Sequence, residues 1–224
     1  KAGLEKGDIA IGYIPDGLAL QMVIKYCSKK QIITMQCVDE LFGKADLKER
    51  SLIYRLNYEY AINSVIPRMD YVLPISHYIQ DYYDQKEIKT FVVPIMADTQ
   101  EYDNVHYDHA ELIKIVYPAN GMVKDNLNDM LEALCQLPEK NRKILEFHIT
   151  GVKKETICES ILERVQASLK GRFIIHEWLD YDELINLYKN TDFLLLARKT
   201  CQMTLANFPS KVPEVMTYGV IPIV

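Results

Sequence analysis

Short apolar segments rich in isoleucine and valine alternate along the chain with stretches whose apolar residues recur every three or four positions. The apolar runs are continuous, which predicts strands covered on both faces. We expect strands at Ile9–Ile14, Ile32–Cys37, Tyr71–Ile75, Phe91–Pro94, Leu112–Tyr117, Ile144–Thr150, Arg172–His176, Phe193–Leu196 and Val220–Val224. Helical periodicity is clearest over 127–134 and 184–188. Strands that alternate with helices predict βαβ units and parallel sheets.

A polar stretch without clear periodicity at 97–109 divides the chain. We therefore expect part of one Rossmann-like domain over 1–98, a linker over 99–110, and a second, truncated domain over 111–224. The chain starts without Met and both ends read as strands, so we expect a piece of a longer polypeptide. Two α/β halves place a ligand cleft at the carboxyl ends of their strands.

Composition narrows the class of protein. The 224 residues are 49% hydrophobic and carry a net charge of −5, which argues for a folded chain and against general binding of nucleic acid. No apolar run approaches the length of a bilayer span. The five cysteines are scattered without a CxxC motif, which is typical of reduced thiols in a cytoplasmic protein.

The most informative segment is Asn207–Val224. Ser210 is suited to cap a short helix that Gly219 ends before the last strand. Backbone N–H groups at Ser210 and Lys211, together with the Lys211 charge, would suit a phosphate. Glu214 could accept hydrogen bonds from vicinal sugar hydroxyls, or could only complement the helix dipole. From the residues alone, both interpretations of Glu214 stay open.

This segment resembles the donor-site signature of family 4 glycosyltransferases, which have the GT-B fold. Glu214 and the run Gly219–Val224 match the family's Glu and Gly-x-Pro-Val strand. Other segments are similar in order and spacing: 116–127, 177–193 and, more weakly, 75–79 and 93–98. The resemblance implies an α/β chain with two Rossmann-like parallel-sheet domains of GT-B type, the first incomplete.

The resemblance also implies roles for individual residues. Lys124, Arg198 and Lys211 would be the catalytic cations that hold the donor pyrophosphate. The residues implied to bind the rest of the donor are Glu214 on the ribose, Trp178 and Leu179 on the base, Ser210 on the phosphate, and Gly121 in the loop after the first strand. No metal and no cofactor beyond the nucleotide-diphosphate sugar are expected.

The sequence departs from the family pattern at three places. Ala119 lies where members often have Arg, and Ala206 lies where many carry a second Glu. The segment Gln36–Asp39 lacks the His that is common in the first domain. By contrast, Arg198 and Phe208–Lys211 fit a variant that some branches of the family show.

Other polar residues have simpler explanations. The triplet Asp180–Asp182 could hold a metal, but capping of the following helix is favoured, with Asp182 suited as N-cap or first-turn residue. Ser76 is expected to cap the helix after it. His106 and His109 read as a surface pair, His148 as a core residue, and His176 as a strand end facing the cleft.

The resemblance implies a retaining, hexosyltransferase-like glycosyltransferase that acts in polysaccharide or cell-envelope glycan synthesis, and we expect the fragment itself to be inactive. Its expected partners are a nucleotide sugar and a glycan or lipid-linked acceptor. We expect a cytoplasmic location, with peripheral contact at the inner face of the membrane left open. Two alternatives stay open because of Ala206 and the absent His: a GT-B nucleotide-sugar epimerase or hydrolase, and a non-catalytic GT-B binding module.

Overall fold

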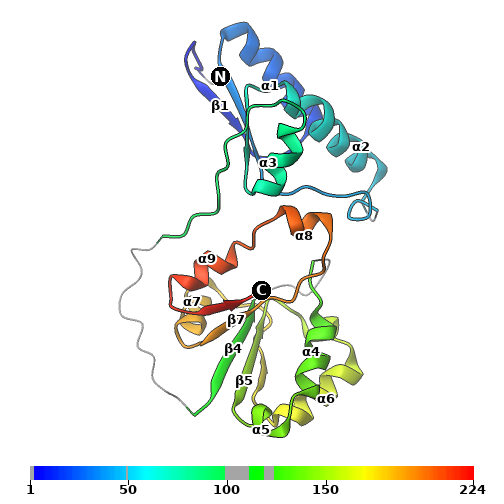
Figure 1. Cartoon of the computed structure of the whole chain (residues 1–224), viewed down its shortest axis with the longest axis vertical. Helices are drawn as coiled ribbons and strands as arrows, with labels where there is room; N and C mark the ends of the chain where they lie inside the picture. The colour runs from blue at the N-terminus through cyan, green and yellow to red at the C-terminus, as the bar shows by residue number, and fades with distance from the viewer. Residues whose placement is uncertain (1–2, 49, 99–110, 119–123) are drawn as a thin grey trace. The chain divides into compact units, whose positions relative to one another are not determined.

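The computed structural model describes residues 3–48, 50–98, 111–118 and 124–224. They form two units, each with a parallel sheet, as Figure 1 shows. Unit 1 comprises the described residues of Lys1–Ile95 together with Thr200–Phe208. Unit 2 comprises those of Met96–Lys199 together with Pro209–Val224. The predicted α/β class with parallel sheets is confirmed.

Unit 1 contains a three-stranded sheet in the order β1-β2-β3. Its strands are β1 (Ile9–Gly12), β2 (Ile33–Val38) and β3 (Tyr71–Pro74). Its helices are α1 (Gly17–Lys30), α2 (Leu52–Tyr60), the π-helix η1 (Ala61–Val65), the 3₁₀ helix η2 (Ile66–Arg68), α3 (His77–Asp84) and α8 (Gln202–Ala206). Ser76 caps α3 as predicted, because its side chain accepts a hydrogen bond from the Ile79 amide at 3.4 Å. The Ser76 hydroxyl also donates to the Ala206 carbonyl at 2.6 Å, which fastens α8 to this unit.

The first strand differs from its prediction in length and in burial. β1 ends at Gly12 rather than Ile14. Ile9 is 50% exposed and Ile11 61% exposed, so the expectation that apolar strands are covered on both faces is wrong for β1. β1 pairs only with β2 within the described chain, so one of its sides carries no strand there.

The predicted strand Phe91–Pro94 is not a strand of the sheet. Only Thr90, just before it, forms a bridge, to Val72. The backbone nevertheless follows β3, since the Phe91 amide donates to the Val72 carbonyl at 3.0 Å and the Val93 amide to the Pro74 carbonyl at 2.9 Å. The segment is exposed at Phe91, and Pro94 has no N–H with which to extend the ladder.

Unit 2 contains a five-stranded sheet in the order β6-β5-β4-β7-β8. Its strands are β4 (Ile113–Pro118), β5 (Leu145–Thr150), β6 (Phe173–Ile175), β7 (Phe193–Leu195) and β8 (Ile221–Ile223). Its helices are α4 (Leu127–Gln136), α5 (Glu139–Arg142), the 3₁₀ helix η3 (Lys154–Thr156), α6 (Glu159–Leu169), α7 (Tyr181–Lys189) and α9 (Lys211–Met216). All five predicted strands are present, with bounds that differ by one residue or so.

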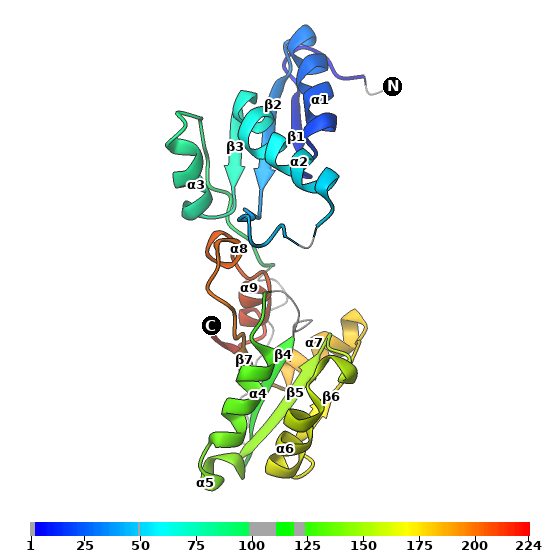
Figure 2. The same ribbon diagram turned by 90° about the vertical axis from the view of Figure 1, so that its right-hand side faces the viewer.

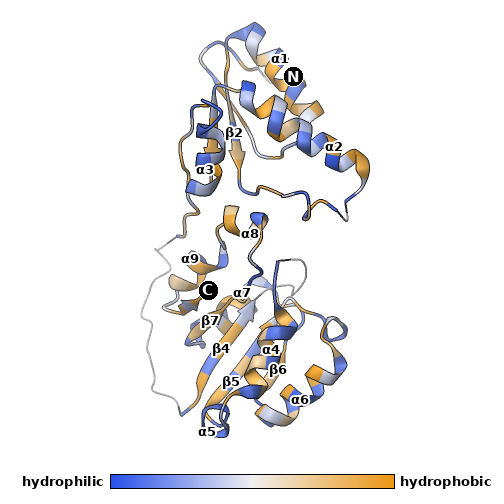
Figure 3. Cartoon of the chain, turned by 45° about the vertical axis from the view of Figure 1, so that its right-hand side comes forward, coloured by the Kyte–Doolittle hydropathy of each residue, from blue (hydrophilic) through white to orange (hydrophobic). Residues whose placement is uncertain are grey.

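The two faces of this sheet have separate cores. Phe147 and Ile149 of β5 pack with Leu131 of α4 and Val165 of α6 on one face. On the other face, Val116 of β4 packs against residues of α7 and α9. Figures 1 and 2 show these two pairs of helices on opposite sides of the sheet. In Figure 3 the strands are mainly hydrophobic, whereas α6 mixes hydrophobic and hydrophilic residues.

No helix among the described residues is long and apolar enough to cross a membrane.

Candidate functional site

The loops that carry the predicted cations Lys124 and Arg198 lie next to each other at the carboxyl edge of the unit 2 sheet. β4 and β7 are parallel neighbours, with Val116 opposite Leu194, so the loops that follow them leave the sheet side by side. The Lys199 amide donates to the Lys124 carbonyl at 3.0 Å. The Asn126 amide donates to the Ala197 carbonyl at 2.9 Å, so backbone bonds hold the two loops together.

Asp125 is the residue at this edge that the sequence interpretation missed. It forms an antiparallel bridge with Arg198, and its Oδ1 lies 4.0 Å from the Arg198 Nε. The Asp125 side chain is only 4% exposed, whereas that of Arg198 is 23% exposed. The buried Asp125 carboxylate therefore places a negative charge close to the Arg198 guanidinium. The available signal was sequence proximity, since Asp125 directly follows a residue already singled out.

The predicted helix at Ser210 is present as α9. Gly219 ends it as expected: its φ is +78°, and its amide donates to the Met216 carbonyl at 3.1 Å. Ser210 lies at the N-cap position, but its side chain makes no capping hydrogen bond, so the predicted side-chain cap is wrong. The reason is local backbone shape, because Ser210 already has helical angles (φ −57°, ψ −28°) rather than the extended conformation of most caps.

Glu214 and Ser210 line a cavity of about 210 Å³ within unit 2. The other lining residues are Met96, Ala97, Asp98, Tyr181, Thr217 and Tyr218. Burial raises the pKa of the Glu214 carboxyl above its usual range, and the positive charge of Lys211 opposes that shift. Among the described residues, none donates a hydrogen bond to this carboxylate. A half-buried carboxylate with open acceptor positions at a cavity is suited to bind hydroxyl donors.

The loop predicted to contact a base lies between β6 and α7. Trp178 in this loop is 85% exposed, and Leu179 is partly buried. Glu177 has a left-handed backbone (φ +52°), and its carbonyl accepts a hydrogen bond from the Gly151 amide at the end of β5. The loop is therefore anchored to the neighbouring strand, while Trp178 stays accessible.

The triplet Asp180–Asp182 serves the start of α7, as predicted. Asp180 is the N-cap: its side chain accepts from the Glu183 amide at 2.9 Å, and the Glu183 carboxylate accepts from the Asp180 amide at 3.0 Å. Asp182 lies in the first turn. The capping interpretation is confirmed: of the two roles expected for Asp182, it takes the one in the first turn, and Asp180 is the cap.

The structure brings some predicted residues together and leaves others apart. Backbone hydrogen bonds join the loops of Lys124 and Arg198, and Ser210, Lys211 and Glu214 share the start of α9. No described contact joins these two groups. Gly121 lies outside the described residues, as do Ala119, His106 and His109. The role of each predicted site residue stays a prediction.

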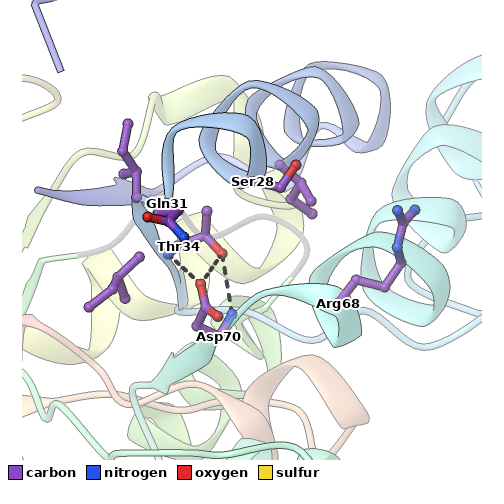
Figure 4. Close-up of a pocket in the computed structure, with 8 residues that line it drawn as sticks. Ser28, Gln31, Thr34, Arg68 and Asp70 are labelled. Carbon is purple, nitrogen blue, oxygen red and sulfur yellow. Dashed lines mark hydrogen bonds between the residues drawn. The ribbon is translucent and has the colours of Figure 1, made fainter. Parts of the chain in front are cut away.

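A second cavity, of about 320 Å³, lies in unit 1 (Figure 4). Asp70, its acidic residue, accepts hydrogen bonds from the Thr34 amide at 2.7 Å and from the Thr34 hydroxyl at 2.9 Å. Thr34 lies near the amino end of β2, and Asp70 comes just before β3. This cavity is thus at the opposite end of the strands from the edge where parallel sheets hold their ligands, and its carboxylate already has partners.

Solved structures show which fold this arrangement belongs to. The chain is similar to WaaG, a glycosyltransferase involved in lipopolysaccharide biosynthesis, with a TM-score of 0.56 and 12% identity over 89% of this chain and 61% of that chain. It is also similar to the UDP-forming α,α-trehalose-phosphate synthase from Burkholderia xenovorans in complex with glucose-6-phosphate, with a TM-score of 0.56 and 10% identity over 96% of this chain and 57% of that chain. The fold is GT-B.

The GT-B likeness is one of structure rather than of sequence. No protein-family model and no curated protein sequence matches the chain. The chain spans about three fifths of the length of the two solved structures described above. The order of strands and helices that the sequence predicted is therefore the order of a GT-B protein, as the resemblance implied.

Proposed function

We propose that the chain is the donor-binding part of a retaining glycosyltransferase that takes a sugar from a nucleoside-diphosphate sugar. The observation that carries the proposal is that backbone hydrogen bonds join the loops of Lys124 and Arg198 at the carboxyl edge of a parallel sheet. Ligands of open α/β sheets bind at this edge. The GT-B fold supports the same interpretation, because WaaG is named a glycosyltransferase and the trehalose-phosphate synthase is named as UDP-forming.

The proposed chemistry follows from charge. When the bond between sugar and phosphate breaks, negative charge grows on the nucleoside diphosphate that leaves. Fixed positive groups aimed at that charge lower the barrier, and such preorganised electrostatics is usually the largest catalytic contribution. Lys124 and Arg198 would supply it, and Lys211 would add a third charge. The proposal needs no metal and no cofactor besides the donor.

Glu214 would position the donor through the ribose. Its carboxylate is half-buried at the cavity and has open acceptor positions, so vicinal hydroxyls could fill them. Trp178 and Leu179 would contact the base, and the amides of Ser210 and Lys211 would face a phosphate. We further propose a saccharide or lipid-linked acceptor in glycan synthesis, and a cytoplasmic reaction with peripheral contact at the inner face of the membrane.

One observation favours an alternative enzyme. Ala206 lies where many family members carry a second Glu, and here it is fully buried in unit 1 against the core under α3. A carboxylate at that position would have to displace packed side chains. A GT-B nucleotide-sugar epimerase or hydrolase is therefore the second candidate function.

Product analysis separates the candidates. The protein is incubated with a panel of nucleotide sugars, with and without saccharide or lipid-linked acceptors, and the products are identified by mass spectrometry. A transferase releases nucleoside diphosphate and extends the acceptor only when acceptor is present. Release of free sugar or formation of an epimer at an equal rate without acceptor would exclude the transferase and support the alternative.

The raised pKa of Glu214 leads to a prediction about how the stability of the folded chain depends on pH. Because burial raises the pKa of this carboxyl in the folded state, the folded chain binds more protons than the unfolded chain between the ordinary and the raised pKa. Stability should therefore fall as pH rises through that interval. Glu214→Gln removes this loss, so its melting temperature should exceed that of the wild type at neutral pH and match it at acidic pH, measured by differential scanning fluorimetry.

Glu139→Gln is the matched control. Glu139 is fully exposed, and its hydrogen bond to Lys143 lowers the pKa of its carboxyl, so its contribution has the opposite sign. Its replacement should lower the melting temperature slightly, and only above acidic pH. A melting temperature of Glu214→Gln below that of the wild type at neutral pH would show that the carboxylate is satisfied within the protein and not held open for a ligand.

A further inference from the structure

A row of titratable side chains crosses one face of the unit 2 sheet. Lys114 on β4 lies opposite Glu146 on β5, and His148 lies opposite Ile174 on β6. His176 follows Ile174 by two residues, so it points to the same face. This is the face covered by α7 and α9, because Val116, two residues after Lys114, belongs to their core. None of these four side chains has a place in the proposed function.

Neighbouring side chains of this row contact one another in space. The Nε2 atom of His148 lies 3.0 Å from the Oε1 of Glu146, and its Nδ1 lies 2.9 Å from the Nε2 of His176. The two imidazole rings are nearly parallel, with planes 10° apart. His148 is only 8% exposed, so it is a buried polar residue with both ring nitrogens engaged.

The donor and acceptor properties of these groups determine which ring nitrogen of each histidine carries a hydrogen. A carboxylate only accepts, so the His148 Nε2 must carry the hydrogen that faces Glu146. A neutral His148 then has a bare Nδ1, which must accept from the Nε2–H of His176. The neutral His176 is left with a bare Nδ1, for which no partner exists among the described residues. The row of side chains therefore ends at the Nδ1 atom of His176, which can accept a hydrogen bond.

The surroundings of His176 favour its neutral form. Burial lowers the pKa of His176, and the neighbouring His148 lowers it further, while the charge of Glu183 on α7 acts in the opposite direction. On the other flank, the Lys114 Nζ lies 3.9 Å from the same Glu146 oxygen that faces His148. His176 is partly exposed, and Glu177 and the accessible Trp178 follow it directly.

We propose that Glu146 and His148 are positioning residues that present the Nδ1 atom of His176 as a hydrogen-bond acceptor to an N–H or O–H group of a bound nucleoside diphosphate. Uptake of one proton by the row turns this acceptor into a donor and removes the bond. Nucleotide affinity then falls as pH drops through the range in which His176 takes up a proton. The inference rests on the proposed donor-binding function, and names a specificity-determining atom within it.

The first test needs no nucleotide. Ring ¹⁵N–¹H correlation spectra of the full chain at pH 8 report which nitrogen of each histidine carries the proton. We expect the Nε2–H tautomer for both His148 and His176, assigned with His148→Gln and His176→Phe. An Nδ1–H tautomer at His148 would overturn the relay, whatever the chain binds.

The second test measures binding. UDP, GDP and ADP are titrated calorimetrically into the full chain from pH 5.5 to pH 8. One lost hydrogen bond corresponds to about a three- to tenfold change, so we expect His176→Phe to weaken binding about that much at pH 8 and to flatten the pH profile. Glu146→Gln should move the midpoint of the pH dependence of affinity to lower pH, because the negative charge that stabilises the protonated histidines is removed. The nucleotide's own phosphate titrates in every variant, so ratios of dissociation constants are compared.

His77→Gln is the control, because His77 is an exposed residue of α3 in unit 1 and should leave affinity and pH profile unchanged. His176→Phe with wild-type affinity and pH profile would overturn the proposal while leaving the donor-binding function intact. Lys124→Ala should weaken binding at every pH without moving the midpoint, which separates the two claims. If none of the three nucleotides binds saturably, the donor-binding function and this inference both fail.

Discussion

Replacing Lys124 with alanine should slow sugar transfer about 10²–10³-fold, with a smaller effect on the Michaelis constant for the donor. A fixed positive charge acts mainly on the negative charge that develops as the nucleoside diphosphate leaves, so its loss raises the transition state more than the ground state. Lys211→Ala should cause a loss of the same kind. The measurement is the steady-state rate of nucleoside diphosphate release in the presence of acceptor.

Lys140→Ala controls for the loss of a lysine from unit 2. Lys140 is exposed on α5, which precedes β5 and so lies at the amino end of that strand. Its replacement should leave the rate within about twofold of the wild type, since surface substitutions away from special features change little. Near-normal rates in both Lys124→Ala and Lys211→Ala would remove the electrostatic mechanism.

Phe147→Ala should destabilise unit 2 by about 3–5 kcal/mol, the usual cost of emptying an aromatic site in a packed core. Phe147 is fully buried in β5, where its ring lies 6.2 Å from that of Phe173. β5 also leads to Gly151, whose amide anchors the loop of Trp178. The change is read as faster hydrogen exchange of the β5 amides, detected by mass spectrometry.

Phe91→Ala is the corresponding control, because it deletes the same side chain at a position that is 67% exposed. Its effect should stay within about 0.5 kcal/mol. If Phe147→Ala changed the exchange of β5 no more than Phe91→Ala, the core of unit 2 would not be packed as the structure shows.

Most strands of this fold could be predicted from local patterns in the sequence. Continuous runs such as 144–150 and 193–196 predicted β5 and β7 nearly to the residue, because two-sided burial leaves a strong signal. The same pattern gave wrong predictions where the apolar side chains are not buried. Ile9 and Ile11 are exposed on an edge strand, and 91–94 accompanies β3 without joining its ladder.

Parts of the candidate site were predictable one residue at a time. Lys124, Arg198 and Glu214 were each singled out, but the contact between the loops of Lys124 and Arg198 depends on which strands become neighbours. The position of Asp125 next to Arg198 could be recognised only from that pairing of strands. The His148–His176 contact has the same origin, since it joins residues 28 positions apart through the register of β5 and β6.

Helix capping by side chains shows a further limit of prediction from the sequence. Both Asp180 and Asp182 are suited to start a helix, and only the observed backbone decides that Asp180 is the cap. Ser210 has the right residue type at the right position, yet its helical backbone angles direct its side chain away from a capping bond. The attachment of α8 to unit 1 through Ser76 and Ala206, 130 positions apart, is likewise a tertiary contact that no local pattern encodes.

Calorimetric titration of UDP, GDP and ADP into the chain, repeated with Lys124→Ala and Lys140→Ala, tests most directly whether unit 2 holds a nucleoside diphosphate. We predict saturable one-site binding of at least one of the three, weakened about tenfold or more by Lys124→Ala because a charge-assisted hydrogen bond is lost, and unchanged by Lys140→Ala. No saturable binding of any of them, or equal affinity in wild type and Lys124→Ala, would contradict it.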